Sequence, residues 1–99
     1  YSNNVVDFYV NKNLNENTFF LFKSNKLILK SEFFQESYEV IFRSFTEIIK
    51  LIGKKYYFVR GKKLEKIISE IDNNSSFKGT LGGCIIEKVN QTIIITKEP

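Results

Sequence analysis

The chain has 99 residues, of which 42% are hydrophobic, ten are Phe and none is His or Met, and its formal net charge is +4. A chain of this length forms one domain and buries roughly two-thirds of its unfolded surface, and its apolar content favours a folded core over disorder. The absence of His excludes Ser-His-Asp and Cys-His catalysis, and a single Cys without His leaves almost nothing for a zinc site and cannot form an internal disulfide.

The absence of Met also means that residue 1 is not a natural translation start. We therefore expect residues 1–99 to be a single domain belonging to a longer protein. No run of 18 apolar residues and no signal-peptide pattern occurs in the chain. On that basis we expect no membrane association and a cytoplasmic location.

The first third of the chain predicts one helix and one hairpin. Residues 2–14 place a cluster of apolar residues between polar ones and suit the end of a helix. Residues 19–22 and 26–29 are short β-rich runs, and Lys23-Ser24-Asn25 between them favours a hairpin turn. Ser31 is then a candidate N-cap for a short helical turn over residues 31–35.

Residues 37–53 predict a longer helix, because their apolar residues recur with a period of 3.6. The apolar face of this helix consists of Ile41, Phe45, Ile48, Ile49 and Ile52. Ser37 is the expected N-cap, and Gly53 is the expected C′ glycine that ends the helix.

A second amphipathic helix is predicted to begin near residue 60 and to stop at Asp72-Asn73-Asn74. Its apolar stripe consists of Leu64, Ile67, Ile68 and Ile71. At about 100° per residue, Lys62, Lys66 and Ser69 lie on the opposite face. We expect the isoleucines to anchor this helix and the lysines to face solvent.

The last quarter predicts two strands, residues 77–89 and 91–98, joined by a tight turn near Asn90. The expected fold class is α+β: a small domain with two main helices packed on short antiparallel strands, including a C-terminal hairpin. Gly82-Gly83-Cys84 is followed by a β-rich run rather than a helix, which disfavours a phosphate-binding loop. We interpret the glycines as a bulge or a close approach of another backbone, and Cys84 as a small buried hydrophobe.

The basic residues are concentrated in one segment. From Lys50 to Lys66 the chain has seven basic residues and one acid, Glu65. Such clustering suits a polyanion, although a solvated basic face would have the same composition. Tyr56 and Tyr57 lie within the segment. Their rings either stack on unpaired bases or belong to the core. The candidate nucleic-acid-binding residues are Lys54, Lys55, Arg60, Lys62, Lys63 and Lys66.

The segments IIKLIGKKYYFVRGKKLEKIISEI and FKGTLGGCIIEKVNQTIIITKEP resemble the region after the catalytic domain in bacterial tRNA(Ile)-lysidine synthetases, particularly the short α-proteobacterial type. The shared pattern begins with a helix that ends in glycine, followed by an aromatic residue and a helix that starts at an arginine. A Thr80–Cys84 strand and a hairpin that ends in Lys97-Glu98-Pro99 complete it. The match covers residues 50–99. The chain departs from the family at Phe58-Val59, where prolines are common, and at Lys54, where a second glycine is common.

The resemblance implies a specific role. Family members activate the wobble cytidine of tRNA(Ile) with ATP, and lysine then attacks the adenylate. This chemistry uses a Ser-Gly-Gly-x-Asp-Ser loop in the catalytic domain, and that loop is absent from this chain. The chain would therefore be an accessory tRNA-binding domain without catalytic residues or cofactors of its own. Its partners would be tRNA(Ile) and the N-terminal catalytic domain, which would hold the ATP and Mg. The alternative is a protein–protein or interdomain structural module that does not bind nucleic acid.

Overall fold

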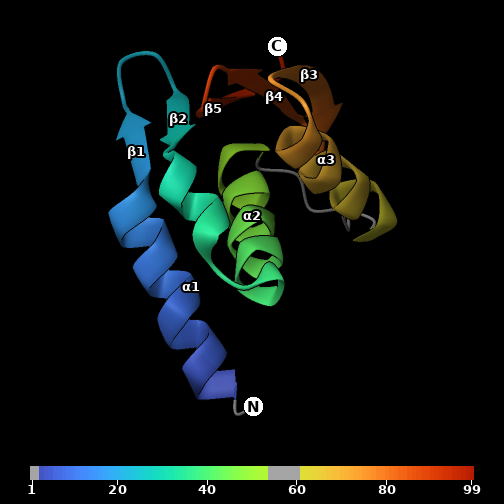
Figure 1. Cartoon of the computed structure of the whole chain (residues 1–99). Coiled ribbons are helices and arrows are strands. Elements are labelled where there is room, and N and C mark those ends of the chain that lie inside the picture. Colours follow the sequence, from blue (N-terminus) through green and yellow to red (C-terminus); the bar gives the residue numbers. More distant parts are fainter. Residues whose placement is uncertain (1–2, 54–60) are drawn as a thin grey trace.

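The computed structural model describes residues 3–53 and 61–99 and has the α+β class expected from the sequence (Figure 1). Its elements are, in chain order, α1 (Asn3–Asn17), β1 (Thr18–Leu21), β2 (Lys26–Leu29), the 3-10 helix η1 (Ser31–Gln35), α2 (Tyr38–Gly53), α3 (Gly61–Asn73), β3 (Ser76–Leu81), β4 (Cys84–Val89) and β5 (Thr92–Lys97).

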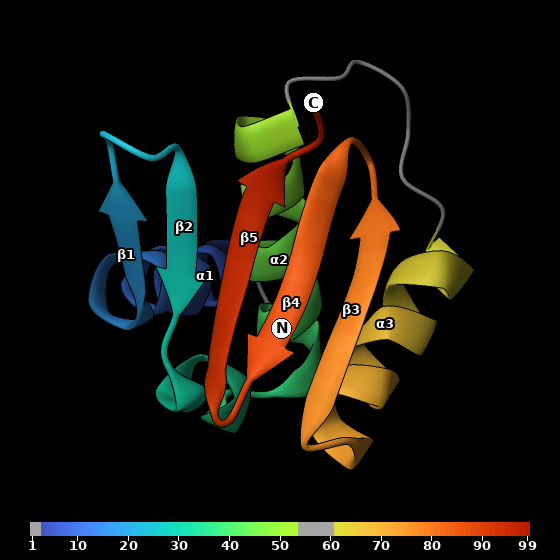
Figure 2. The same cartoon turned by 90° about the horizontal axis from the view of Figure 1, so that it is seen from above.

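The five strands form one antiparallel sheet in the order β1-β2-β5-β4-β3. The last strand of the chain, β5, thus lies at the centre and joins the N-terminal hairpin to the C-terminal one. Ile94 of β5, for example, pairs with Ile28 on one side and Glu87 on the other. All three α-helices lie on one face of the sheet, and within the described residues no element covers the other face (Figure 2).

The hydrophobic core lies between the sheet and the helices. The predicted apolar faces of α2 and α3 are both buried, which confirms the two amphipathic helices. They meet the inward-facing side chains of β2, β4 and β5, such as Leu29, Ile86 and Ile95, and the ring of Phe33 from η1. Each fully buried side chain of this size contributes roughly 1.5–3 kcal/mol relative to its exposed state.

Of the two predicted N-caps, one is confirmed and one is wrong. The Ser37 hydroxyl accepts a hydrogen bond from the backbone N–H of Val40 at 3.4 Å, as an N-cap does. Ser31 is not a cap, because η1 begins after Lys30 without a side-chain cap. The Ser31 hydroxyl instead donates to the Glu32 carboxylate at 2.6 Å, and this hydrogen bond lowers the pKa of Glu32.

Helix α1 is held on the body by two small valines and one buried amide. Val6 and Val10 pack with Val40 of α2 in a cluster separate from the main core. Asn13 is only 1% exposed, and its Nδ2 donates to the backbone oxygen of Phe33 at 3.3 Å and to Ser44 Oγ at 3.4 Å. The amide therefore links α1 to η1 and α2.

The expected strand over residues 77–89 is wrong, because a turn at Gly82-Gly83 divides it into β3 and β4. Gly82 and Gly83 have φ of 57° and 84°, and two consecutive positive φ values are typical of the tight two-residue turn of a β-hairpin. The predicted turn near Asn90 is confirmed, because Asn90 lies between β4 and β5 with φ 58°.

The predicted close backbone approach at these glycines is confirmed, and its partner is Gly53. A Cβ added to Gly53 would overlap the carbonyl oxygen of Gly82. Gly53 is the last residue of α2 and is not among the described residues with positive φ, so its predicted role as a left-handed C′ residue is wrong. Gly53 instead provides space for the β3–β4 turn. Next to it, Cys84 is buried and its thiol lies 3.6 Å from the carbonyl oxygen of Ile49.

Candidate nucleic-acid interface

Helix α3 separates an apolar face from a charged face whose lysines lie in its first two turns. Leu64, Ile67, Ile68 and Ile71 are buried against the body of the protein, next to β3 and α2. Lys62, Lys63 and Lys66 are all exposed. The helix lies at the side of the molecule farthest from α1, beside β3 (Figure 1). Three of the six predicted site residues are therefore brought together on one exposed helix.

The other three predicted residues, Lys54, Lys55 and Arg60, lie outside the described residues. Tyr56 and Tyr57 lie in the same segment. The described part of the candidate interface is therefore the part formed by α3.

The α3 lysines are not neutralised by carboxylates of the described chain. Within residues 3–53 and 61–99, the ion pairs are Arg43–Asp7 and Lys50–Glu47, and neither involves α3. Glu65, the only acid in the basic segment, lies close enough to Tyr38 at the start of α2 to affect it. Burial raises the pKa of Tyr38, and the negative charge of Glu65 raises it further.

Polar side chains continue the lysine row toward the end of α3. Ser69 and Asn73 follow Lys66 on the same face, and Asn73 Nδ2 donates to Ser69 Oγ at 3.3 Å. With a rise of 1.5 Å per residue, the row from Lys62 to Asn73 is about 16 Å long. The row offers ammonium groups at one end and hydrogen-bonding groups at the other.

The C-terminal end of α3 is capped by a lysine from the sheet. Lys88 Nζ donates to the carbonyl oxygens of Ile71 at 2.6 Å and Asn74 at 2.8 Å. A cation at this end is favourable because the last carbonyls of a helix carry partial negative charge. Lys88 therefore ties the end of α3 to β4 and is not part of the exposed lysine row. No sequence pattern predicts this contact, because the two segments meet only in the folded chain.

A metal centre would need several ligand side chains close together among the described residues. No three acidic or cysteine side chains among them form a group that could hold a metal ion. What α3 can do chemically is to present the ammonium groups of Lys62, Lys63 and Lys66 within its first two turns, where they can neutralise phosphates of a nucleic acid.

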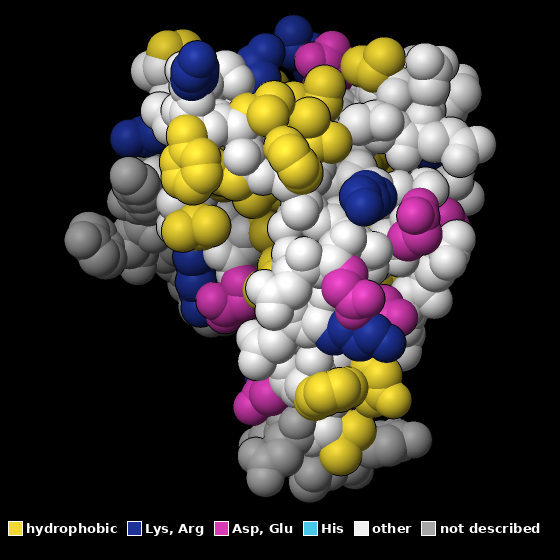
Figure 3. All heavy atoms as spheres, turned by 90° about the vertical axis from the view of Figure 1, so that its left-hand side faces the viewer, with side chains coloured by type: hydrophobic (Ala, Val, Ile, Leu, Met, Phe, Trp, Pro, Cys, Tyr) yellow, Lys and Arg dark blue, Asp and Glu magenta, His cyan; other side chains and the backbone are white. Residues whose placement is uncertain are grey.

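A second candidate site is an apolar groove on the side of the molecule formed by α1 and β1 (Figure 3). It lies between the β1–β2 hairpin and the C-terminal half of α2 and has a volume of about 660 Å³. Phe20, Phe22, Ile48, Leu51 and Ile52 form much of its apolar wall.

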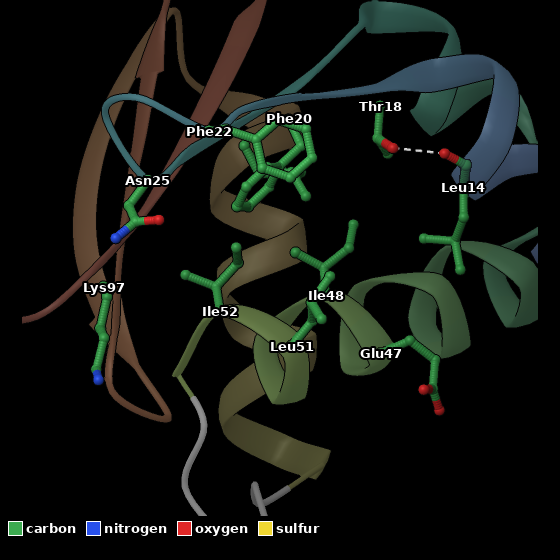
Figure 4. A pocket seen from close by; sticks show the side chains of 11 residues that line it. Leu14, Thr18, Phe20, Phe22, Asn25, Glu47, Ile48, Leu51, Ile52 and Lys97 are labelled. Carbon is green, nitrogen blue, oxygen red and sulfur yellow. Dashed lines mark hydrogen bonds between the residues drawn. The ribbon is translucent and has the colours of Figure 1, made fainter.

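The groove exposes large apolar side chains at its mouth. Phe22 is 84% exposed and Leu51 is 59% exposed, and the rings of Phe20 and Phe22 pack edge to face at 4.8 Å. Lys97 of β5 and Glu47 of α2 lie on opposite sides of the groove (Figure 4). No local sequence pattern predicts this site, because residues as distant as Leu14 and Lys97 line it together.

Comparison of the chain with protein-family models, with curated proteins and with solved structures gave no match. None of the described helices combines the length and the hydropathy that crossing a membrane requires.

Proposed function

We propose that this chain is the tRNA-binding accessory domain of a tRNA(Ile)-lysidine synthetase. In this proposal Lys54, Lys55, Arg60, Lys62, Lys63 and Lys66 contact the phosphates and riboses of tRNA. The observation that supports it best is the geometry of α3, on which Lys62, Lys63 and Lys66 are exposed and face no carboxylate partner within the described residues.

Phosphate contacts explain how such a domain acts without catalytic residues. Lysines that neutralise phosphates release condensed counterions, and this supplies affinity with little dependence on base sequence. Held in this way, the tRNA body would present the anticodon loop to the catalytic domain, where ATP and Mg would bind. Orientation of this kind contributes several kcal/mol to a reaction barrier.

The proposal is tested by measuring tRNA binding to the chain at several salt concentrations by fluorescence anisotropy. We expect weak binding whose affinity falls steeply with salt, in proportion to the number of phosphates neutralised. The double variant Lys62→Glu/Lys66→Glu should weaken binding by at least about tenfold, because two phosphate contacts become repulsive.

The matched control is Lys23→Glu/Lys26→Glu on the β1–β2 hairpin, where both lysines are exposed. Each Lys→Glu exchange removes two charge units, so both double variants lower the formal net charge from +4 to 0. The control should bind tRNA more tightly than the α3 variant. Equal losses in the two variants would mean that net charge, and not α3, determines binding.

The assignment to lysidine synthesis needs a separate test in the complete protein. There, Lys62→Glu/Lys66→Glu should raise KM for tRNA(Ile) with little change in kcat, because the variant alters tRNA binding and leaves the chemistry in place. Retention of KM would contradict the proposed role of this helix.

The second candidate function is a protein–protein or interdomain module. The apolar groove with the exposed Phe22 and Leu51 favours it, because exposed apolar patches of this kind mark contact sites. The two functions use different sides of the molecule and are compatible.

A further inference from the structure

The outward face of α1 is apolar, although the exposed face of a helix in water is normally polar. Val5, Phe8 and Tyr9 are 41%, 61% and 42% exposed, and their spacing of three and four residues places them in one stripe. The rings of Phe8 and Tyr9 pack edge to face at 5.3 Å. This stripe lies opposite Val6 and Val10, which attach α1 to the body.

The stripe and the groove lie on the same face of the molecule. Figure 3 shows hydrophobic side chains gathered in two areas of this face, one over the hairpin and the end of α2, the other over the N-terminal turns of α1. Polar and charged side chains separate the two areas. A short apolar helical stripe and an apolar groove thus occur on one surface, at opposite ends.

This arrangement suits a two-fold symmetric contact. If a second copy faces the first and is related to it by a 180° rotation about an axis that lies between the two faces, perpendicular to the line from stripe to groove, each stripe lies over the partner's groove. Such an interface is self-complementary and closes at two copies. Three apolar side chains in one helical stripe are also the usual means by which a helix binds in a groove.

Charged residues beside the stripe and the groove also favour a second copy of the chain as the partner. Lys12 follows Tyr9 by one turn on the stripe and is exposed, whereas Glu47 lies at the border of the groove with its side chain 57% exposed. A stripe bound with Lys12 on the Glu47 side of the groove would place a lysine of one copy near a carboxylate of the other and away from Lys97 on the opposite side. Glu47 now faces Lys50 at 3.8 Å, a loose surface pair that can rearrange at little cost.

We propose that this face is the interface of a homodimer in which Val5, Phe8 and Tyr9 of each copy bind the groove formed by Phe20, Phe22 and Leu51 of the other. Burial of the exposed phenylalanine rings provides the main attraction, since large aromatic side chains in pockets dominate interface energetics. Because α3 lies on the other side of the molecule, the dimer leaves the α3 lysines accessible (Figure 1).

The dimer and the tRNA complex should respond to salt in opposite directions. Two copies that each carry +4 repel one another at low ionic strength, and salt screens that repulsion while it strengthens apolar burial. Raising the salt concentration should therefore tighten the dimer and weaken tRNA binding. This difference separates failure of the dimer from failure of the proposed function.

The experiment is sedimentation equilibrium of the chain up to millimolar concentration at high ionic strength. We expect the wild type to form a dimer, and Phe8→Ser and Phe22→Ser each to raise the dissociation constant at least about tenfold. Both side chains are exposed, so the monomer should stay folded, which circular dichroism verifies. Leu51→Ser is a second groove variant in case Phe22→Ser alters the hairpin.

The matched control is Phe19→Ser. Phe19 is 60% exposed on β1 but pairs with Ile28 and does not line the groove, so its replacement should leave the dimer intact.

A mixture of the Phe8→Ser and Phe22→Ser chains provides the sharpest test. The intact stripe of the Phe22→Ser chain can bind the intact groove of the Phe8→Ser chain, so one of the two contacts returns. The mixture should associate more tightly than either variant alone. A monomeric wild type at every concentration, a Phe19→Ser effect as large as that of Phe22→Ser, or no rescue in the mixture would each overturn the proposal.

Discussion

Helices α1 and α3 lie on the same face of the sheet, but they differ in the side chains of both their buried side and their exposed side. Helix α3 turns four aliphatic side chains inward and lysines outward. Helix α1 turns two valines and an amide inward, while Val5, Phe8 and Tyr9 are exposed. The difference teaches that attachment to the core and the character of the outer surface are separate properties of a helix. It also divides the surface into a side with the exposed lysines of α3 and a side with exposed apolar residues.

The largest expected effect concerns the attachment of α3. Ile68→Ala should lower the free energy of unfolding by about 2–5 kcal/mol, because it removes buried methyl groups and leaves a cavity in the main core. Urea denaturation measures the loss. Ser69→Ala, one residue further and exposed, should stay within about 0.5 kcal/mol of the wild type. Equal effects would contradict the assignment of the two faces.

The attachment of α1 should depend on an amide rather than on apolar area. Asn13→Ala should destabilise the fold by about 1–3 kcal/mol, because Ser44 and the Phe33 carbonyl lose a buried hydrogen-bond partner. Asn11→Ala on the exposed side of the same helix is the control and should have little effect. Thermal unfolding of the two variants distinguishes them. A neutral Asn13→Ala would mean that the apolar contacts of Val6, Val10 and Leu14, together with the Asp7–Arg43 ion pair, hold α1.

A third prediction concerns the orientation of α3. Lys88→Met keeps the aliphatic length of the side chain but removes the ammonium group that caps Ile71 and Asn74. We expect a loss of about 1–2 kcal/mol and faster hydrogen exchange in the last turn of α3. Lys78→Met, exposed on β3, is the control for loss of charge. The cap has no structural role if the two variants exchange alike.

The smallest effect on stability is expected on the outer face of α3. Lys66→Ala should change the free energy of unfolding by no more than about 0.5 kcal/mol, since the side chain is exposed. The same variant should reduce the slope of log affinity for tRNA against log salt by about one unit, as loss of one phosphate contact does. An unchanged slope would remove Lys66 from the interface.

Local sequence patterns predicted the elements whose causes are local. The 3.6-residue period of the isoleucines predicted α2 and α3, and the hairpin turns at Lys23–Asn25 and Asn90 followed from residues that favour turns. The orientation of Lys62 and Lys66 followed from the same period, because a buried stripe fixes the opposite face of a helix.

Features that depend on distant residues were not predictable in this way. Gly82-Gly83 suits either a bulge or a hairpin turn, and the pairing of β3 with β4 decides between them. Asn13 gives no sign of burial until η1 and α2 surround it. The groove has no sequence pattern, because its walls come from α1, the β1–β2 hairpin, α2 and β5.

The central position of β5 has a consequence for biosynthesis. A nascent chain that has left the ribosome only as far as residue 91 has both of its outer strand pairs, β1–β2 and β3–β4, but lacks the strand that joins them. The two halves can form local structure during translation, whereas the sheet and the core beneath it close only after Thr92–Lys97 emerges. Frameshifts or stop codons within these six residues should therefore yield chains that proteases remove, even though most of the sequence is intact.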